Sequence, residues 1–182
     1  SYDLVPALSP KHSAHLYRSD DGGGTFEYIE PIAWDPKGAI GFYEPTLLSC
    51  PDGSLRAFLR TDHREDRLAS AIKPSSSARF APFELMDVVG HPAIALPLCT
   101  GRMLLVYGYR HEGYGVRARL LDAHGDPIPE REELVIRDDG PGPDLGYPWA
   151  VERSDGSVLV SYYHVDDEGC RYIAGSLLEP IG

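Results

Sequence analysis

Residues 46–59 read TLLSCPDGSLRAFL, two apolar runs on either side of a Pro-Asp-Gly turn. Asp-Gly between two strand-like runs is the strongest short-range sequence signal of a β-hairpin. The stretch therefore predicts two antiparallel β-strands joined by a tight turn at Gly53.

The same hairpin pattern occurs three times along the chain, in residues 41–60, 90–107 and 146–163. Each copy begins with Gly, soon reaches Pro, and then runs through an apolar strand, a turn with Gly and a second apolar strand. The turn glycines are 48 and 55 residues apart: Gly53, Gly101 and Gly156. An internal repeat of this length is typical of stacked or radially arranged structural units.

Further strands are expected after each hairpin. Residues 115–121 and 171–177 predict a third strand, and residues 82–88 and 133–136 predict a fourth strand in the first two copies. Four antiparallel strands per repeat is the pattern of a β-propeller blade. No stretch sustains a helical i, i+3, i+4 rhythm, so we expect an all-β chain in one domain with almost no helix.

Composition and charge exclude several function classes. The 182 residues carry a formal net charge of -11, which disfavours binding to nucleic acid or to an anionic membrane, because both require a cationic surface. No apolar run reaches the length of a transmembrane span, and no signal peptide pattern is visible. The chain starts at Ser1 without Met, so the compartment stays open.

The cysteines and the polar loops predict no metal site and no cofactor. Cys50, Cys99 and Cys170 lie far apart, are odd in number and form no CxxC pair, so we interpret them as core or strand thiols. Residues 62–66 and 164–168 contain His, Asp and Glu side chains, but without the spacing of a known metal-ligand motif.

Residues 19–26, SDDGGGTF, fit the pattern Ser-x-Asp-x-Gly-x-Thr-aromatic. This stretch resembles the Asp box, or BNR repeat, of the sialidase-like β-propeller superfamily. The resemblance implies a six-bladed parent fold, with this turn between the third and fourth strands of a blade. The Asp and Ser side chains are expected to bind turn amides, and Phe26 is expected to tuck between neighbouring sheets.

Residues 41–48, GFYEPTLL, and the strand that ends at Arg60 are similar to the sialidase segment that carries a catalytic glutamate and a substrate-binding arginine. Residues 144–148, DLGYP, resemble the segment that supplies the tyrosine nucleophile. The resemblance implies that Glu44 activates Tyr147, and that Arg60 grips a substrate carboxylate. Guanidinium groups bind carboxylates bidentately, and a phenol needs a nearby base to attack.

The repeat supports these candidates without reference to any family. Glu44, His91 and Tyr147 occupy equivalent places at the start of the first strand in each copy, where side chains can converge on a central channel. The alternative is that all three only pack around that channel, and a buried His bonded to its neighbours is the commoner case.

A third substrate-binding arginine is implied by the sialidase resemblance. Arg110, which follows the second strand of the middle copy, is the first choice. Arg117 and Arg119 alternate with apolar residues on the next strand, so we interpret them as a solvated face or as partners between blades.

The chain is expected to hold about half of a six-bladed ring. Residues 1–40 would end one blade and include the Asp box, residues 41–88 and 89–137 would form two full blades, and residues 138–182 would supply three strands of the last. The N-terminal catalytic arginine and the acid/base aspartate of sialidases have no counterpart. Either the chain belongs to a longer propeller, or two copies close a ring as a homodimer, because open sheet faces and edges are rarely left uncovered.

Two functions follow from these observations. The first is a sialidase-like glycoside hydrolase, or part of one, that binds a carbohydrate ligand with Arg60, Arg110 and His91, and attacks it with Tyr147 assisted by Glu44. The second is a non-catalytic propeller module that binds a glycan or a protein, since a fold alone does not establish an activity.

Overall fold

The computed structural model describes residues 11–63, 65–128 and 132–180. These residues form thirteen strands in four antiparallel sheets, and they contain no helix. No helix long and apolar enough to cross a membrane is therefore found among them. The all-β prediction is confirmed, and the chain divides into two compact units that are described separately, residues 1–87 and 88–182.

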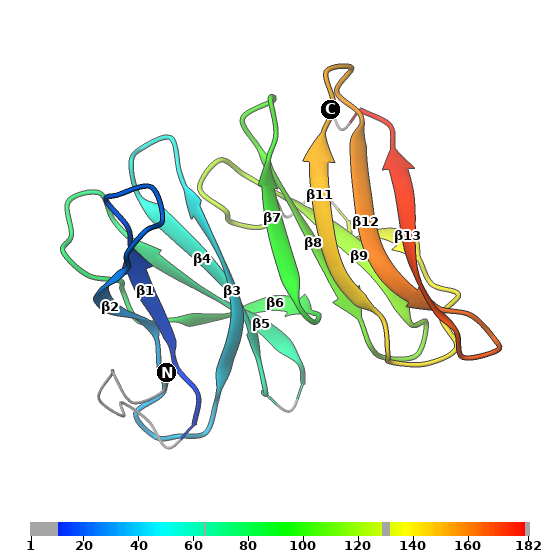
Figure 1. Cartoon of the computed structure of the whole chain (residues 1–182), viewed down its shortest axis with the longest axis horizontal. Helices are drawn as coiled ribbons and strands as arrows, with labels where there is room; N and C mark the ends of the chain where they lie inside the picture. Colours follow the sequence, from blue (N-terminus) through cyan, green and yellow to red (C-terminus); the bar gives the residue numbers. More distant parts are fainter. Residues whose placement is uncertain (1–10, 64, 129–131, 181–182) are drawn as a thin grey trace. The chain divides into compact units, whose positions relative to one another are not determined.

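The first unit contains a two-stranded sheet, β1-β2, and most of a four-stranded sheet with the order β3-β4-β5-β6 (Figure 1). Strand β6 ends two residues beyond the boundary of this unit. The strands are β1 (Ala14–Arg18), β2 (Glu27–Ala33), β3 (Phe42–Ser49), β4 (Leu55–Thr61), β5 (Arg67–Lys73) and β6 (Glu84–Val89).

The second unit contains a four-stranded sheet with the order β10-β9-β8-β7 and a three-stranded sheet with the order β11-β12-β13 (Figure 1). The strands are β7 (Ala93–Pro97), β8 (Met103–Tyr109), β9 (Gly115–Leu121), β10 (Leu134–Arg137), β11 (Gly146–Glu152), β12 (Val158–Val165) and β13 (Arg171–Leu178).

The three predicted hairpins are confirmed, and their turns share one geometry. Gly53, Gly101 and Gly156 have φ angles of 80°, 80° and 81°, in the left-handed region that glycine enters at no steric cost. In each turn the glycine amide donates to the carbonyl three residues earlier, at 3.0, 2.9 and 2.9 Å. The repeat seen in the sequence is therefore a repeat of turn conformation.

The turn between β1 and β2 is organised by the Asp21 carboxylate. It accepts hydrogen bonds from the Thr25 amide at 3.0 Å and the Thr25 hydroxyl at 2.8 Å, while Ser19 Oγ accepts from the Gly23 amide at 2.8 Å. These bonds agree with the roles expected for Asp and Ser in this turn. Phe26 was expected to tuck between sheets, but 66% of it is exposed, so that expectation is wrong for this chain.

Sheet packing forms the core of the first unit. Ala14, Ile32 and Ala33 from the two-stranded sheet pack against Phe42 and Leu59 of the four-stranded sheet. A buried ion pair joins the same two sheets: the Glu30 carboxylate binds Lys73 and accepts the Phe80 amide at 3.2 Å. Both oxygens of this buried carboxylate therefore have donors, as burial of a charge requires.

The core of the second unit lies between its two sheets. Leu104 and Val106 of β8 face a cluster to which β12 contributes Val158, Val160 and Tyr162. Strand β8 is buried at almost every position, whereas β12 alternates buried with exposed residues. One face of the β11-β12-β13 sheet is therefore packed, and the other is not.

The cysteine interpretation holds only for Cys50, which is buried beside the first hairpin turn. Cys99 and Cys170 are exposed and lie in the connections between strands rather than in strands or in the core. The backbone at both positions is bound to acidic side chains and not to a neighbouring strand. The Cys99 amide donates to Glu152, and the Cys170 amide donates to Asp166.

A buried histidine lies between the two sheets of the second unit. His164 is 1% exposed, and its Nε2 is 3.8 Å from the nearest oxygen of Asp139, beyond hydrogen-bond distance. The rings of Tyr162 and Tyr172 pack beside it, and Arg137 lies near enough to repel its charged form. Burial, followed by the repulsion of Arg137, lowers the pKa of His164 below its ordinary value of 6.5.

Protonation of His164 is expected to destabilise the second unit. A folded-state pKa below the unfolded value means that the unfolded chain binds the proton first, so stability is present above pH 6.5 and is lost as the pH falls below it. We expect His164→Phe to flatten the pH dependence of the melting temperature just below pH 6.5. The exposed His124→Phe should keep the wild-type slope, and parallel profiles for all three proteins would contradict this assignment.

A second pH effect is expected at the Ser19–Phe26 turn. Hydrogen bonds from Thr25 and Ser19 hold the pKa of Asp21 far below its ordinary value of 3.8, so its contribution to stability is present above pH 3.8 and is lost as the pH falls through the folded-state value. Asp21→Asn should therefore lower the melting temperature at pH 7, and the difference from wild type should shrink in acid. Asp20→Asn is the matched control, because the Asp20 carboxylate is bonded to Arg18.

Candidate functional site

The two candidate catalytic residues share an unusual backbone conformation. Glu44 has φ 48° and Tyr147 has φ 49°, two of the three non-glycine residues with positive φ among those described. Each lies in an irregularity of strand pairing, between Tyr43 and Thr46 in one sheet and between Gly146 and Trp149 in the other. A bulge of this kind redirects a side chain, and such strain concentrates at functional sites.

Glu44 and Arg60 are brought together in the first unit. The guanidinium Nη1 of Arg60 lies 3.2 Å from Glu44 Oε2 and 3.5 Å from Oε1. Roughly a third of each side chain is exposed, so the pair contributes little to stability in water. The pair instead fixes the orientation of both groups at the start of β3 and the end of β4.

Three chain segments converge beside Tyr147 in the second unit. The His91 amide donates to the Gly108 carbonyl at 2.8 Å, which joins the start of the β7 segment to the end of β8. A Cβ atom built on Gly108 would lie 2.2 Å from the His91 carbonyl oxygen and 3.2 Å from the Cα of Gly146. The lack of a side chain at Gly108 therefore allows His91 and the residue before Tyr147 to approach each other.

Arg110 positions the segment that leads into Tyr147. Its Nε and Nη2 both donate to the Leu145 carbonyl, at 3.1 and 2.9 Å, and its guanidinium carbon lies 5.7 Å from the centre of the Tyr147 ring. The structure thus places Arg110 next to the candidate nucleophile, with much of its donor capacity bound to the backbone.

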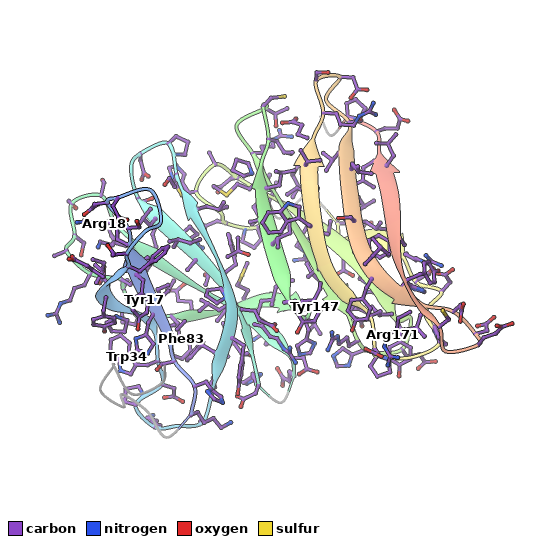
Figure 2. The ribbon with its side chains drawn as sticks, viewed as in Figure 1. Tyr17, Arg18, Trp34, Phe83, Tyr147 and Arg171 are labelled. Atoms are coloured by element: carbon purple, nitrogen blue, oxygen red, sulfur yellow. The ribbon has the colours of Figure 1, made fainter. Side chains whose placement is uncertain are left out.

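A polar network that was not predicted from the sequence lies beside Tyr147. The Tyr163 hydroxyl donates to Asp144 Oδ1 at 2.8 Å, and Arg171 binds Asp144 Oδ2. The Tyr163 and Tyr147 rings lie 6.0 Å apart, and Figure 2 shows Tyr147 and Arg171 at the same end of the β11-β12-β13 sheet. These bonds lower the pKa of Asp144, and burial and then Asp144 raise that of Tyr163.

Prediction of this network from the sequence would require knowledge of the strand register. Tyr163 is the register partner of Gly146, and Arg171 is paired with Val165 on the next strand. In the alignment of the repeats, Tyr163 of the third hairpin is equivalent to Arg60 of the first. This equivalence is the one sequence signal that could have pointed to Tyr163.

Arg117 is not part of a solvated face, so that interpretation is corrected. Its Nη1 donates to Glu133 at 2.6 Å, and its guanidinium carbon lies 3.3 Å from the centre of the Tyr109 ring. Glu133 also accepts the hydroxyl of the buried Tyr107. The arginine is used inside its own sheet, because the Tyr107 hydroxyl and the Glu133 carboxylate need partners there.

Each candidate residue thus has a defined place. Glu44 and Arg60 are paired in the first unit, and the second unit gathers His91, Arg110 and Tyr147 at one end of its sheets. The described residues contain no cluster of three or more His, Cys, Asp or Glu side chains that could hold a metal ion. Residue 64 of the 62–66 loop lies outside them, as do residues 1–10 of the first expected partial blade.

Comparisons with known proteins identify similar structures but no family. No protein-family model and no curated protein matches the sequence. A protein of unknown function from Dyadobacter fermentans is 43% identical, with a TM-score of 0.88 over 94% of this chain and 46% of that one. This chain therefore spans about half of the length of that protein.

Two enzymes have a similar fold at low identity. An α-L-arabinanase from Penicillium chrysogenum, solved with arabinobiose, is 17% identical, with a TM-score of 0.61 over 85% of this chain and 52% of the enzyme. An intramolecular trans-sialidase from Ruminococcus gnavus, solved with oseltamivir carboxylate, is 19% identical, with a TM-score of 0.58 over 92% of this chain and 38% of the enzyme. The likeness concerns the fold, which is β-propeller-like.

The close approach at Gly108 yields a test of the site's construction. Gly108→Ala places a methyl group against the His91 carbonyl and should lower the free energy of unfolding by about 1–3 kcal/mol, as overpacking does. Gly142→Ala is the matched control, because a Cβ there meets no atom within 4 Å. Urea unfolding measures both variants, and equal stability of the two would show that the three segments do not meet as described.

Proposed function

We propose that this chain is a sialidase-like glycoside hydrolase, or part of one, that acts on a glycan or an anionic sugar. Tyr147 is the nucleophile, and Glu44 is the base that assists it. The single observation that carries the proposal is the shared left-handed backbone at Glu44 and Tyr147. Two large non-glycine residues in this conformation, at equivalent places in a repeat, are costly unless their side chains need a particular direction.

A cation lies beside the proposed nucleophile. The guanidinium carbon of Arg110 is 5.7 Å from the centre of the Tyr147 ring, within the range of a cation–π contact. In the proposed reaction the Tyr147 oxygen attacks the anomeric carbon, and the bond to the leaving group breaks. Water then hydrolyses the glycosyl-tyrosine bond, which regenerates the enzyme, a departure from the usual pair of carboxylates.

Recognition of an anionic sugar would fall to the arginines. Arg60, Arg110 and His91 are the candidates from the sequence, and Arg171 joins them because it lies in the same network and its side chain is 67% exposed. Arg60 and Arg171 are each paired with a carboxylate, Glu44 and Asp144. A substrate carboxylate would compete with these side chains for bidentate guanidinium contacts.

A non-catalytic binding module is the second candidate function. The pairing of Glu44 with Arg60 favours it, because both oxygens of the Glu44 carboxylate lie within 3.5 Å of the Arg60 guanidinium, so the carboxylate already has a partner in its own unit. In this alternative the same side chains bind a glycan or a protein without breaking a bond. The two candidates therefore differ in chemistry and involve the same residues.

An aryl glycoside assay separates them. 4-Methylumbelliferone is a good leaving group that needs no protonation, so an α-sialoside and an α-L-arabinofuranoside of it test the nucleophile alone. We expect release of the fluorophore by the wild-type chain and a fall of about 100-fold or more with Tyr147→Phe. Tyr172→Phe, on the same sheet, should retain activity.

Two results would count against the hydrolase. Equal activity of Tyr147→Phe and wild type would place the nucleophile elsewhere. Inactivity of the wild-type chain, combined with sugar binding by calorimetry that Arg171→Ala weakens, would establish the binding module instead.

A further inference from the structure

Both arginines beside Tyr147 are bound within the second unit. Arg110 donates from Nε and Nη2 to the Leu145 carbonyl, at 3.1 and 2.9 Å. Arg171 uses the same pair of nitrogens to bind Asp144 Oδ2, with its Nε at 2.8 Å. Two neighbouring N–H groups are what a guanidinium offers to a carboxylate in a bidentate contact. On both arginines the protein itself occupies such a pair of donors.

The other two candidates for ligand binding are also bound or buried. In the first unit, both oxygens of Glu44 lie within 3.5 Å of Arg60 Nη1. In the second unit, His91 is 6% exposed, so its side chain presents little surface to a ligand. A ligand with a carboxylate would therefore have to displace a protein group from each arginine that it binds.

Asp144 places a fixed negative charge beside Arg171. Hydrogen bonds from Tyr163 and Arg171 lower the pKa of Asp144, so its carboxylate is ionised at neutral pH. The Tyr163 hydroxyl binds Oδ1 at 2.8 Å, and it holds the carboxylate in place when Oδ2 loses its contact with Arg171. A ligand carboxylate that replaced Asp144 on Arg171 would therefore lie beside a second carboxylate. Like charges in such apposition are costly across an interface.

The same ion pair suits the hydroxyl groups of an uncharged sugar. A hydroxyl group both donates and accepts hydrogen bonds, whereas an ionised carboxylate only accepts them. The Arg171–Asp144 pair presents donors and acceptors side by side, and the two side chains are 67% and 51% exposed. Tyr163, which binds Asp144, has its ring 6.0 Å from that of Tyr147, and Figure 2 shows Arg171 and Tyr147 at the same end of the sheet. Hydroxyl groups can therefore bind both members of the pair, close to Tyr147, without breaking the contact between them.

We propose that the sugar bound at Tyr147 is uncharged, and that the Arg171–Asp144 pair binds its hydroxyl groups and rejects sugars that carry a carboxylate. This choice of ligand class rests on the proposed function and narrows it, because it concerns the same residues. Specificity of this kind combines an attractive contact with a repulsive one. Arg171 supplies the donors of the attractive contact, and Asp144 supplies the charge that repels an acidic sugar.

Matched sugars test the rejection of a carboxylate directly. Glucose and glucuronic acid differ only in a hydroxymethyl group that is replaced by a carboxylate, and so do galactose and galacturonic acid. Methyl glycosides of both anomers are titrated against the wild-type chain at pH 7 and followed by ligand-observed NMR. A methyl α-L-arabinofuranoside joins the neutral series, and a methyl α-sialoside joins the acidic series. We expect the neutral sugars to bind more tightly than the acidic ones by about tenfold or more.

Asp144→Asn should convert the rejection into binding. Asparagine has the size of aspartate, and its amide oxygen can still accept the Tyr163 hydroxyl, but the negative charge beside Arg171 is gone. We expect the affinity of this variant for the acidic sugars to rise by about tenfold or more. Asp167→Asn is the matched control, because it removes the same charge from the exposed turn between β12 and β13 and should keep the wild-type preference.

The contrary outcomes differ in what they overturn. Tighter binding of the acidic sugars by the wild-type chain would overturn the uncharged ligand class and leave the proposed function in place. An Asp144→Asn variant that keeps the wild-type preference would also overturn it, because Asp144 would then have no part in the selection. If the wild-type chain binds neither series, the proposed function and the ligand class fail together.

Discussion

The burial of sheet faces against one another is the constraint on which this structure depends. A sheet of two to four short strands is marginal in water unless another element covers its apolar face. Here each unit obtains its core from such a contact, between β1-β2 and β3–β6 in one and between β7–β10 and β11–β13 in the other. The burial of Leu104 and Val106 in β8 and the alternation in β12 follow from this contact, because these residues lie on the two faces that meet.

Local backbone chemistry explains why the strands and turns could be predicted. Gly53, Gly101 and Gly156 mark the hairpins because the left-handed turn position selects glycine, and the flanking apolar runs then have only one antiparallel partner within reach. The expected fourth strands at 82–88 and 133–136 lie within two residues of β6 and β10. These features depend on residues that are close in sequence, so they can be recognised in a single sequence.

Features that depend on contacts across strands were harder to predict. The Asp144, Tyr163 and Arg171 network joins residues up to 27 positions apart, and its members meet only through the register of β12 and β13. Arg117 was misread for the same reason, since its partner Glu133 belongs to the next strand segment. Phe26 was misplaced because a motif predicts its turn but not what lies beyond the turn to cover the ring.

The packing of the sheets also supports the backbone conformation of the candidate site. Strained positions such as Glu44 and Tyr147 cost of order 1–3 kcal/mol each and persist only where the surroundings fix them. At Tyr147 that surrounding is the close approach of Gly108, Gly146 and the His91 carbonyl, which the packing of β7 and β8 against β11 brings about. Tyr147 therefore combines a backbone in close contact with its neighbours and a side chain that is half-exposed. Packing against the core fixes the backbone of Tyr147. Its ring is half-exposed and therefore remains accessible to a ligand.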